Sequence, residues 1–336
     1  MSQDNSTELK LRERAKQLLE EVDLLIGYSQ GSIATRVKPL FINGGTKQEA
    51  ELTEKLIFNG YCVNDLSVYA YSKLREIAGK IGIILKPCDV KSIVQLISEE
   101  LISRKKIYAI VVGCSGVLDY KKILKQANGA SVFSAKEQDG NLIIETAGSV
   151  INAKKADIYL DKCYGCTIYD KPPYFNEYIE NILKPEINLT QAIDRKEDKY
   201  NSETSQISLL EKLEKGRLAE AAAFWEKEFG RCIRCYACRN ICPLEVCRDR
   251  CISNLDSPRW QTQQITAKEG KFFQLIRVMH LAGRCTECGE CDRACPQNIP
   301  ILVLMRKMNN VVAKLFDYKA GMDIQQKPPL LTYKNV

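Results

Sequence analysis

The chain has 336 residues, of which 45% are hydrophobic and 27% charged, and its formal net charge is +7. This is enough apolar sequence for two domains with cores of their own. Fifteen residues are cysteine, and thiols that bind metal lose their protons, so metal-bound cysteines would offset much of the positive charge. The basic balance therefore does not predict nucleic-acid binding.

The sequence also predicts no secretion signal and no membrane span. The first ten residues lack the basic and apolar segments of a signal peptide. The longest apolar runs, such as residues 107–112, are far too short to cross a bilayer. Together with the many cysteines, this predicts a protein of the reducing cytoplasm.

The first half of the chain is predicted to hold a helix followed by an α/β domain. Residues 1–35 read as the helix, because apolar side chains recur on one face between residues 8 and 26. Residues 36–187 alternate between strand and helix patterns. The predicted strands are residues 40–42, 81–85 and 107–112, and the predicted helices are residues 47–58, 65–79 and 90–102, the last two capped by Asn64 and Asp89. Residues 129–160 look strand-rich. The strand–helix–strand order predicts a parallel sheet with helices on both faces.

The second half is predicted to be helical. A polar linker over residues 188–206 leads into a long helix over residues 207–229, which Gly230 follows. We expect residues 207–316 to form an α-rich domain and residues 317–336 to form a tail.

Eight cysteines of this second domain form two copies of one pattern. The copies are Cys232-Ile-Arg-Cys235-Tyr-Ala-Cys238-Arg-Asn-Ile-Cys242-Pro243 and Cys285-Thr-Glu-Cys288-Gly-Glu-Cys291-Asp-Arg-Ala-Cys295-Pro296. This is the ligand run of bacterial dicluster ferredoxins, in which three cysteines bind one 4Fe-4S cluster and the fourth binds the other. We therefore predict one cluster on Cys232, Cys235, Cys238 and Cys295, and a second on Cys285, Cys288, Cys291 and Cys242. Zinc fits poorly, because it favours two C-x-x-C pairs far apart in sequence.

Four further cysteines are predicted to meet in the α/β domain. Cys88 and Cys114 each follow a predicted parallel strand, and such strands end at one edge of the sheet. Cys163 and Cys166 add a C-x-x-C pair. We predict a third 4Fe-4S cluster on these four thiols. The alternatives are buried single cysteines, a redox-active pair and a zinc site.

The α/β domain carries segments that resemble a known family. They are Lys86-Pro87-Cys88-Asp89-Val90, Gly113-Cys114, and Cys163-Tyr-Gly-Cys166 followed by Tyr169-Asp-Lys-Pro-Pro173. Over residues 35–315 the chain resembles the beta subunit of the deazaflavin (coenzyme F-420) hydrogenases, dehydrogenases and related formate dehydrogenases, joined to a dicluster 4Fe-4S ferredoxin domain. The resemblance implies an electron-input or electron-output subunit beside hydrogenase, formate dehydrogenase or heterodisulfide-reductase-type partners. Several members hold a flavin, yet no glycine-rich dinucleotide fingerprint follows a strand here.

These features predict an iron–sulfur electron-transfer subunit of a cytoplasmic, anaerobic oxidoreductase complex. Its partners would be the catalytic subunits of that complex, or a ferredoxin. The alternative is an iron–sulfur flavoenzyme, in which the α/β domain binds FAD and itself oxidises or reduces a two-electron carrier. No metal role is predicted for Cys62, Cys247 and Cys251, with replacement ligands, packing or a reactive pair as the alternatives. His280 is predicted to pack on an apolar helix.

Overall fold

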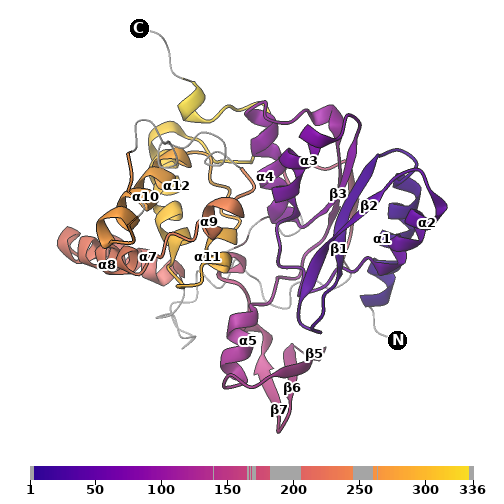
Figure 1. The fold of residues 1–336 in the computed structure, drawn as a ribbon, viewed down its shortest axis with the longest axis horizontal. Coiled ribbons are helices and arrows are strands. Elements are labelled where there is room, and N and C mark those ends of the chain that lie inside the picture. Colours follow the sequence, from indigo (N-terminus) through magenta and orange to yellow (C-terminus); the bar gives the residue numbers. More distant parts are fainter. Residues whose placement is uncertain are drawn as a thin grey trace. The chain divides into compact units, whose positions relative to one another are not determined.

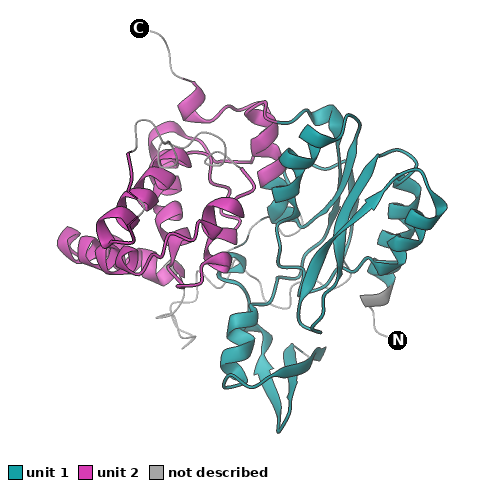
Figure 2. Ribbon diagram, in the orientation of Figure 1, with its two compact units in different colours: residues 1–91, 102–197 teal, residues 92–101, 198–336 magenta. Residues whose placement is uncertain are grey.

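The computed structural model describes residues 4–138, 140–164, 166, 168, 172–181, 206–244, 260–262 and 264–332. The chain divides into two units, residues 1–91 with 102–197 and residues 92–101 with 198–336 (Figure 2). The predicted linker lies outside the described residues, apart from Gln206. None of the described helices is long and apolar enough to cross a bilayer.

A five-stranded sheet forms the centre of the first unit (Figure 1), in the order β2-β1-β3-β4-β8. Its strands are β1 (Leu24–Gln30), β2 (Val37–Asn43), β3 (Ile81–Leu85), β4 (Ile107–Val112) and β8 (Glu177–Ile179). Neighbouring strands are parallel, except that β2 is antiparallel to β1. Nearly every residue of β1, β3 and β4 is buried, as expected of parallel strands covered on both faces. The predicted α/β fold is confirmed.

Helices flank this sheet on both sides. They are α1 (Asp4–Leu18), α2 (Lys47–Ala50), α3 (Ala70–Glu76) and α4 (Pro87–Ser98). Figure 1 shows α1 and α3 on opposite sides of the sheet. Short 3-10 helices connect the elements at Glu51–Lys55, Leu66–Tyr69, Arg104–Lys106, Lys155–Asp157 and Asp161–Cys163. Because β3 and β4 are parallel neighbours, the loops that follow them leave the same edge of the sheet.

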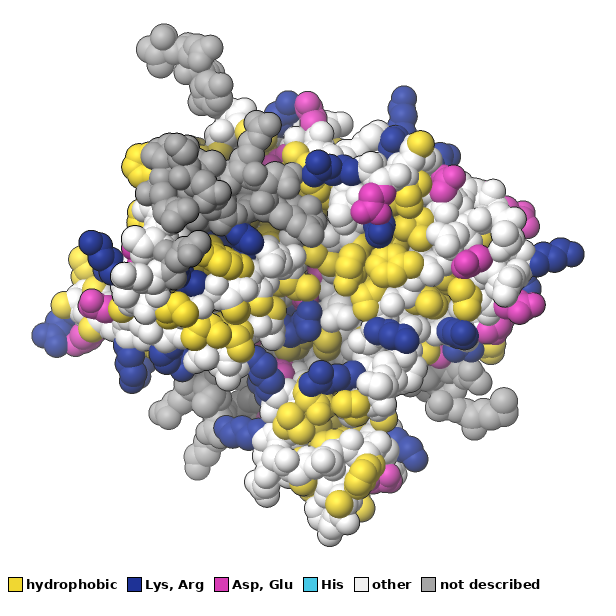
Figure 3. Space-filling view, in the orientation of Figure 1, with side chains coloured by type: hydrophobic (Ala, Val, Ile, Leu, Met, Phe, Trp, Pro, Cys, Tyr) yellow, Lys and Arg dark blue, Asp and Glu magenta, His cyan; other side chains and the backbone are white. Residues whose placement is uncertain are grey.

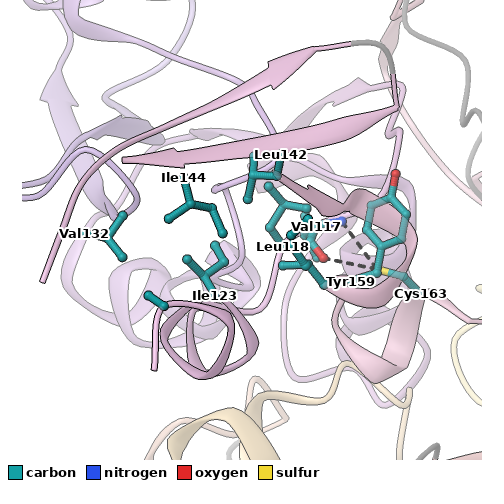
Figure 4. Packing of buried hydrophobic residues seen from close by; sticks show 11 residues of the cluster. Val117, Leu118, Ile123, Val132, Leu142, Ile144, Tyr159 and Cys163 are labelled. Carbon is teal, nitrogen blue, oxygen red and sulfur yellow. Dashed lines mark hydrogen bonds between the residues drawn. The ribbon is translucent and has the colours of Figure 1, made fainter. Parts of the chain in front are cut away.

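A smaller antiparallel sheet lies in the strand-rich segment predicted at residues 129–160. It consists of β5 (Val132–Gln138), β6 (Asn141–Thr146) and β7 (Val150–Lys154). Its buried side chains pack with those of α5 (Tyr120–Gln126), and Figure 4 shows Leu142 and Ile144 beside Ile123. Cys163 belongs to the same cluster, so this small core helps to fix the position of a predicted ligand.

The second unit is helical, which confirms the predicted α-rich C-terminal domain. Its helices are α7 (Gln206–Lys215), α8 (Leu218–Gly230), α9 (Ala237–Asn240), α10 (Ala267–His280), α11 (Glu290–Ala294) and α12 (Ile301–Phe316), and a 3-10 helix follows at Pro329–Leu331. Residues 92–101 cluster with this unit. There the Ser92 hydroxyl lies 3.0 Å from that of Thr286, and the Gln95 Oε1 accepts hydrogen bonds from Tyr318 and Gly321.

The predicted N-terminal helix was too long. Helix α1 ends at Leu18, and residues 24–26 lie in β1 in the middle of the sheet. The run Leu24-Leu25-Ile26 is apolar on every residue, and such short runs fit a buried strand as well as a helix. The segment 1–35 is therefore part of the α/β fold.

Other predicted helices were also too long or capped differently. Only Lys47–Ala50 is α-helical within residues 47–58, and α4 starts at Pro87, whose missing N–H suits a first turn, so Asp89 lies inside that helix. Asp65, not Asn64, accepts the capping hydrogen bond, which Ser67 N–H donates. The long helix predicted over residues 207–229 is two helices, because Gly216 weakens the helix and Arg217 is extended.

Candidate iron–sulfur centres

The two cysteine motifs of the second unit adopt matching backbone conformations. Positive φ angles occur at equivalent positions, at Arg234 (48°) and Tyr236 (59°) in the first motif and at Glu287 (60°) and Gly289 (75°) in the second. Each loop then enters a short helix, α9 or α11. The last cysteine of each motif donates its N–H to the carbonyl three residues earlier, at 3.2 Å in both cases. The repeated sequence is therefore also a repeated structure.

Cysteines from both motifs line one cavity. They are Cys285, Cys288 and Cys291 of the second motif and Cys242, the last cysteine of the first motif. These are the four thiols that the ferredoxin pattern assigns to one cluster. The fold thus places the last cysteine of the first motif beside the first three cysteines of the second.

The remaining four cysteines of the motifs form the second set. Negative charge on Cys232 and on Cys295 raises the pKa of Cys238. Cys295 of the second motif therefore lies near the thiols of the first motif. Cys232, Cys238 and Cys295 are buried, whereas Cys235 is exposed. The Cys232 Sγ accepts a hydrogen bond from Gln274 Nε2 at 3.7 Å, and the Cys295 Sγ accepts one from the Ile299 N–H at 3.5 Å.

Burial makes these thiols hard to ionise by themselves. It raises the pKa of Cys285 to about 12, and it also raises the pKa values of Cys238 and Cys291. The charge of Arg277 opposes this rise at all three. A coordinating metal deprotonates a thiol outright, so iron would replace the proton that burial otherwise favours.

Arg277, which the sequence reading missed, has the side chain that best fits a bound cluster. It is only 2% exposed and lines the cavity. Its Nη2 donates to the Cys238 carbonyl at 3.0 Å, whereas its buried Nη1 has no hydrogen-bond partner. A buried donor without an acceptor is costly, and the sulfur atoms of a 4Fe-4S cluster in this cavity would accept its hydrogen bond. The four thiols and the buried donor thus fit a cluster in their chemistry.

Cys88, Cys114, Cys163 and Cys166 of the first unit are also neighbours. Negative charge on Cys114 raises the pKa of Cys88, and negative charge on Cys163 and Cys166 raises the pKa of Cys114. Burial is the main cause that raises the pKa of Cys114 to about 12 and that of Cys163 to about 11. The Cys163 Sγ accepts a hydrogen bond from the Val117 N–H at 3.4 Å (Figure 4). The predicted meeting of these thiols is therefore present in the fold.

Two lysines bring positive charge to this thiol group. Lys86 is fully buried, with its Nζ 2.5 Å from the Asp89 carboxylate and 2.7 Å from the Tyr28 hydroxyl. Lys162 lies 3.8 Å from the same carboxylate. The charges of both lysines lower the pKa of Cys88 and of Cys163, against the larger effect of burial. Such cations favour the thiolate form that metal binding requires.

A second cavity opens beside Cys114. Lys86, Asn59, Ser115, Gly116 and Asn181 are among its lining residues. Gly116 has a φ of +99°, and a Cβ there would lie 2.5 Å from the Tyr159 ring. Only glycine meets both conditions, so Gly116 fixes the course of the loop after Cys114.

The described cysteines are all free thiols. Among the described residues, no three His, Cys, Asp or Glu side chains converge on one point, as a single metal ion would require. A 4Fe-4S cube instead takes its thiolates at four separate irons.

The residues without a predicted metal role are placed as follows. Cys62 is buried and accepts a hydrogen bond from the Asn59 N–H at 3.4 Å. His280 lies in the last turn of α10. Cys247 and Cys251 lie outside the described residues.

Comparison with known proteins agrees with the motifs. A family model described as a 4Fe-4S dicluster domain matches residues 228–299. The chain is 26% identical to the F420-dependent formate dehydrogenase subunit beta of Methanocaldococcus jannaschii, over 75% of this chain and 76% of the relative. It is 25% identical to the F420-dependent formate dehydrogenase 1 subunit beta of Methanococcus maripaludis, over 75% of each chain.

One solved structure, of the F420-reducing NiFe hydrogenase complex from Methanosarcina barkeri, aligns with a TM-score of 0.35 and 20% identity. That alignment covers 48% of this chain and 58% of the other. The sequence relatives and the dicluster match confirm the resemblance predicted from the motifs and the presence of a dicluster iron–sulfur domain.

Proposed function

We propose that this chain passes single electrons through two 4Fe-4S clusters, as the beta-type subunit of a multi-subunit oxidoreductase. The comparisons confirm the broader class, an iron–sulfur electron-transfer subunit of an oxidoreductase complex. The observation that carries the proposal is the cavity that Cys242 shares with Cys285, Cys288 and Cys291. When bound, a 4Fe-4S cluster takes up and releases one electron at a time.

The proposed ligands of the other cluster are Cys232, Cys235, Cys238 and Cys295. Cys235 is the one exposed thiol of the eight, so this cluster would lie close to the protein surface on that side. Electrons cross between proteins most readily where a centre lies close to the surface. We therefore place electron exchange with a partner at the Cys235 side. The partner would be a catalytic subunit of the complex, or a ferredoxin, and the cytoplasm remains the proposed location.

A third cluster on Cys88, Cys114, Cys163 and Cys166 is part of the proposal. Its support is the mutual electrostatic interaction of these thiols and the two lysines beside them. The main chain supplies polar support as well, since Gly116 donates its N–H to the Cys114 Sγ at 3.4 Å. Three clusters would bring about six negative charges against the formal +7 of the chain.

An iron–sulfur flavoenzyme is the second candidate function. The observation that favours it is the cavity lined by Lys86 and Gly116, which lies at the loop that follows β4. Acid extraction of the purified protein separates the two candidates. Released flavin in a ratio near one per chain would establish the flavoenzyme, and its absence from fully iron-loaded protein would favour the electron-transfer subunit.

Iron and acid-labile sulfide, measured on anaerobically purified full-length protein, test the number of clusters. Three clusters predict about twelve of each per chain, and two predict about eight. The double variant Cys114→Ser/Cys163→Ser should lose about four irons. The matched control is Cys62→Ala, a buried thiol of the same unit, which should lose none. Equal iron content in the double variant and the unmodified protein would contradict the third cluster.

A further inference from the structure

Arg277 has no carboxylate partner among the described residues, whereas several other arginines around the cysteine motifs do. Arg231 pairs with Glu228, Arg284 with Glu99, Arg293 with Glu290 and Arg306 with Glu287. Within the described part of the chain, no carboxylate lies within ion-pair distance of Arg277. Its positive charge is nevertheless almost completely buried. A buried, unpaired cation is destabilising unless negative charge is supplied to it.

The groups that face Arg277 are the thiols of both sets. Burial lowers the pKa of its guanidinium, but the charges of Cys291, Cys238, Cys242 and Cys285 raise it above the ordinary value. Cys238 belongs to one set of four, and the other three belong to the second. The Nη2 hydrogen bond reaches the backbone of the first set, and the side chain lines the cavity of the second. The guanidinium of Arg277 thus lies next to both sets of cysteines.

We propose that Arg277 raises the reduction potentials of both 4Fe-4S clusters by holding one positive charge next to both sets of ligands. The inference rests on the proposed function, because it needs the two clusters to be present. Each added electron makes a cluster more negative, and a fixed cation in a site of low dielectric constant stabilises that added charge. The other arginines named above are each paired with a carboxylate that offsets their charge, so they contribute less.

The shared position of Arg277 has a further consequence. Because one charge acts on both clusters, its removal lowers both potentials in the same direction. A residue that tuned one cluster alone would separate them instead. Arg277 would then shift the two potentials together and leave the difference between them largely unchanged.

The test is an EPR-monitored redox titration of the full-length, cluster-loaded protein. In Arg277→Gln, which keeps a side-chain donor for the Cys238 carbonyl but loses the charge, the reduction equilibrium of each cluster should fall at least tenfold, or about 59 mV for one electron. Arg277→Lys, which keeps the charge, should recover at least half of that shift. Arg231→Met removes an exposed, paired arginine beside Cys232 and should shift either cluster less than twofold.

Unchanged potentials in Arg277→Gln with full iron content would overturn the inference, and so would equal shifts in the Gln and Lys variants. If Arg277→Gln does not assemble its clusters, Arg277→Lys decides: potentials within threefold of the unmodified protein support the role of the charge, and a tenfold fall contradicts it. Failure of the proposed function would look different, since the unmodified protein itself would then show no reducible iron–sulfur signal.

Discussion

Lys86 and Asp89 form an ion pair with no exposed surface on either side chain, and the Tyr28 hydroxyl and the Asn64 carbonyl complete the environment of the lysine. Asp65 is buried in the same region, where its carboxylate accepts hydrogen bonds from Ser67. Burial, together with the nearby charge of Asp89, raises the pKa of Asp65 to about 7. At the scale of single residues, the core of the α/β unit therefore contains buried ionisable side chains.

This raised pKa predicts how stability depends on pH. The folded protein keeps a proton on Asp65 up to about pH 7, whereas the unfolded chain loses it near pH 4, so stability should fall as pH rises between these values. Between pH 5.5 and pH 7.5 the loss from this group is about 2 kcal/mol. Asp65→Asn, which retains the acceptor for Ser67, should remove that fall in urea unfolding. An undiminished fall would contradict the assignment, and Glu76→Gln, at an exposed carboxylate, is the matched control.

At the scale of elements, α10 positions the side chains that face the first motif and the cavity. Thr266 caps its start by accepting the Glu269 N–H at 3.2 Å, and Gln274 and Arg277 follow three residues apart on one face. Thr46 caps the short helix α2 in the other unit with the same residue spacing, accepting the Glu49 N–H at 3.2 Å. The two caps are locally alike but support different structures.

The two caps give a matched pair of variants. Thr266→Ala and Thr46→Ala should each cost about 1 kcal/mol of stability. Only Thr266→Ala should also speed the loss of iron to a chelator, because it loosens the helix that holds Gln274 and Arg277. Equal rates of iron loss in the two variants would show that α10 does not secure the clusters.

Local sequence predicted some elements well and others poorly, for identifiable reasons. The strands β3 and β4 were predicted because each is an apolar run between clear breaks, and the motif cysteines because their spacing is specific. The strand β1 was missed because its apolar run continues the helical pattern of α1. Arg277 could not be predicted as functional, because its partners are thiols 8 to 39 residues away in sequence that only the folded structure brings near it.

At the scale of the whole molecule, the positive net charge of the chain is related to its many cysteines, because clusters bound to them would carry negative charge. The formal charge of +7 is spread over both units, and Figure 3 shows Lys and Arg side chains on each of them. Clusters would bring negative charge inside, close to buried cations such as Arg277 and Lys86. Such clusters would offset much of the basic composition.

The most direct test of this account asks which cysteines act on the same cluster. Single Cys→Ser variants at four positions, Cys235, Cys288, Cys242 and Cys295, should be compared by EPR of the reduced protein. Crossover between the motifs predicts that Cys242→Ser alters the same signal as Cys288→Ser, and that Cys295→Ser alters the same signal as Cys235→Ser. If Cys242→Ser instead alters the signal that Cys235→Ser alters, each motif binds its own cluster and the account is wrong.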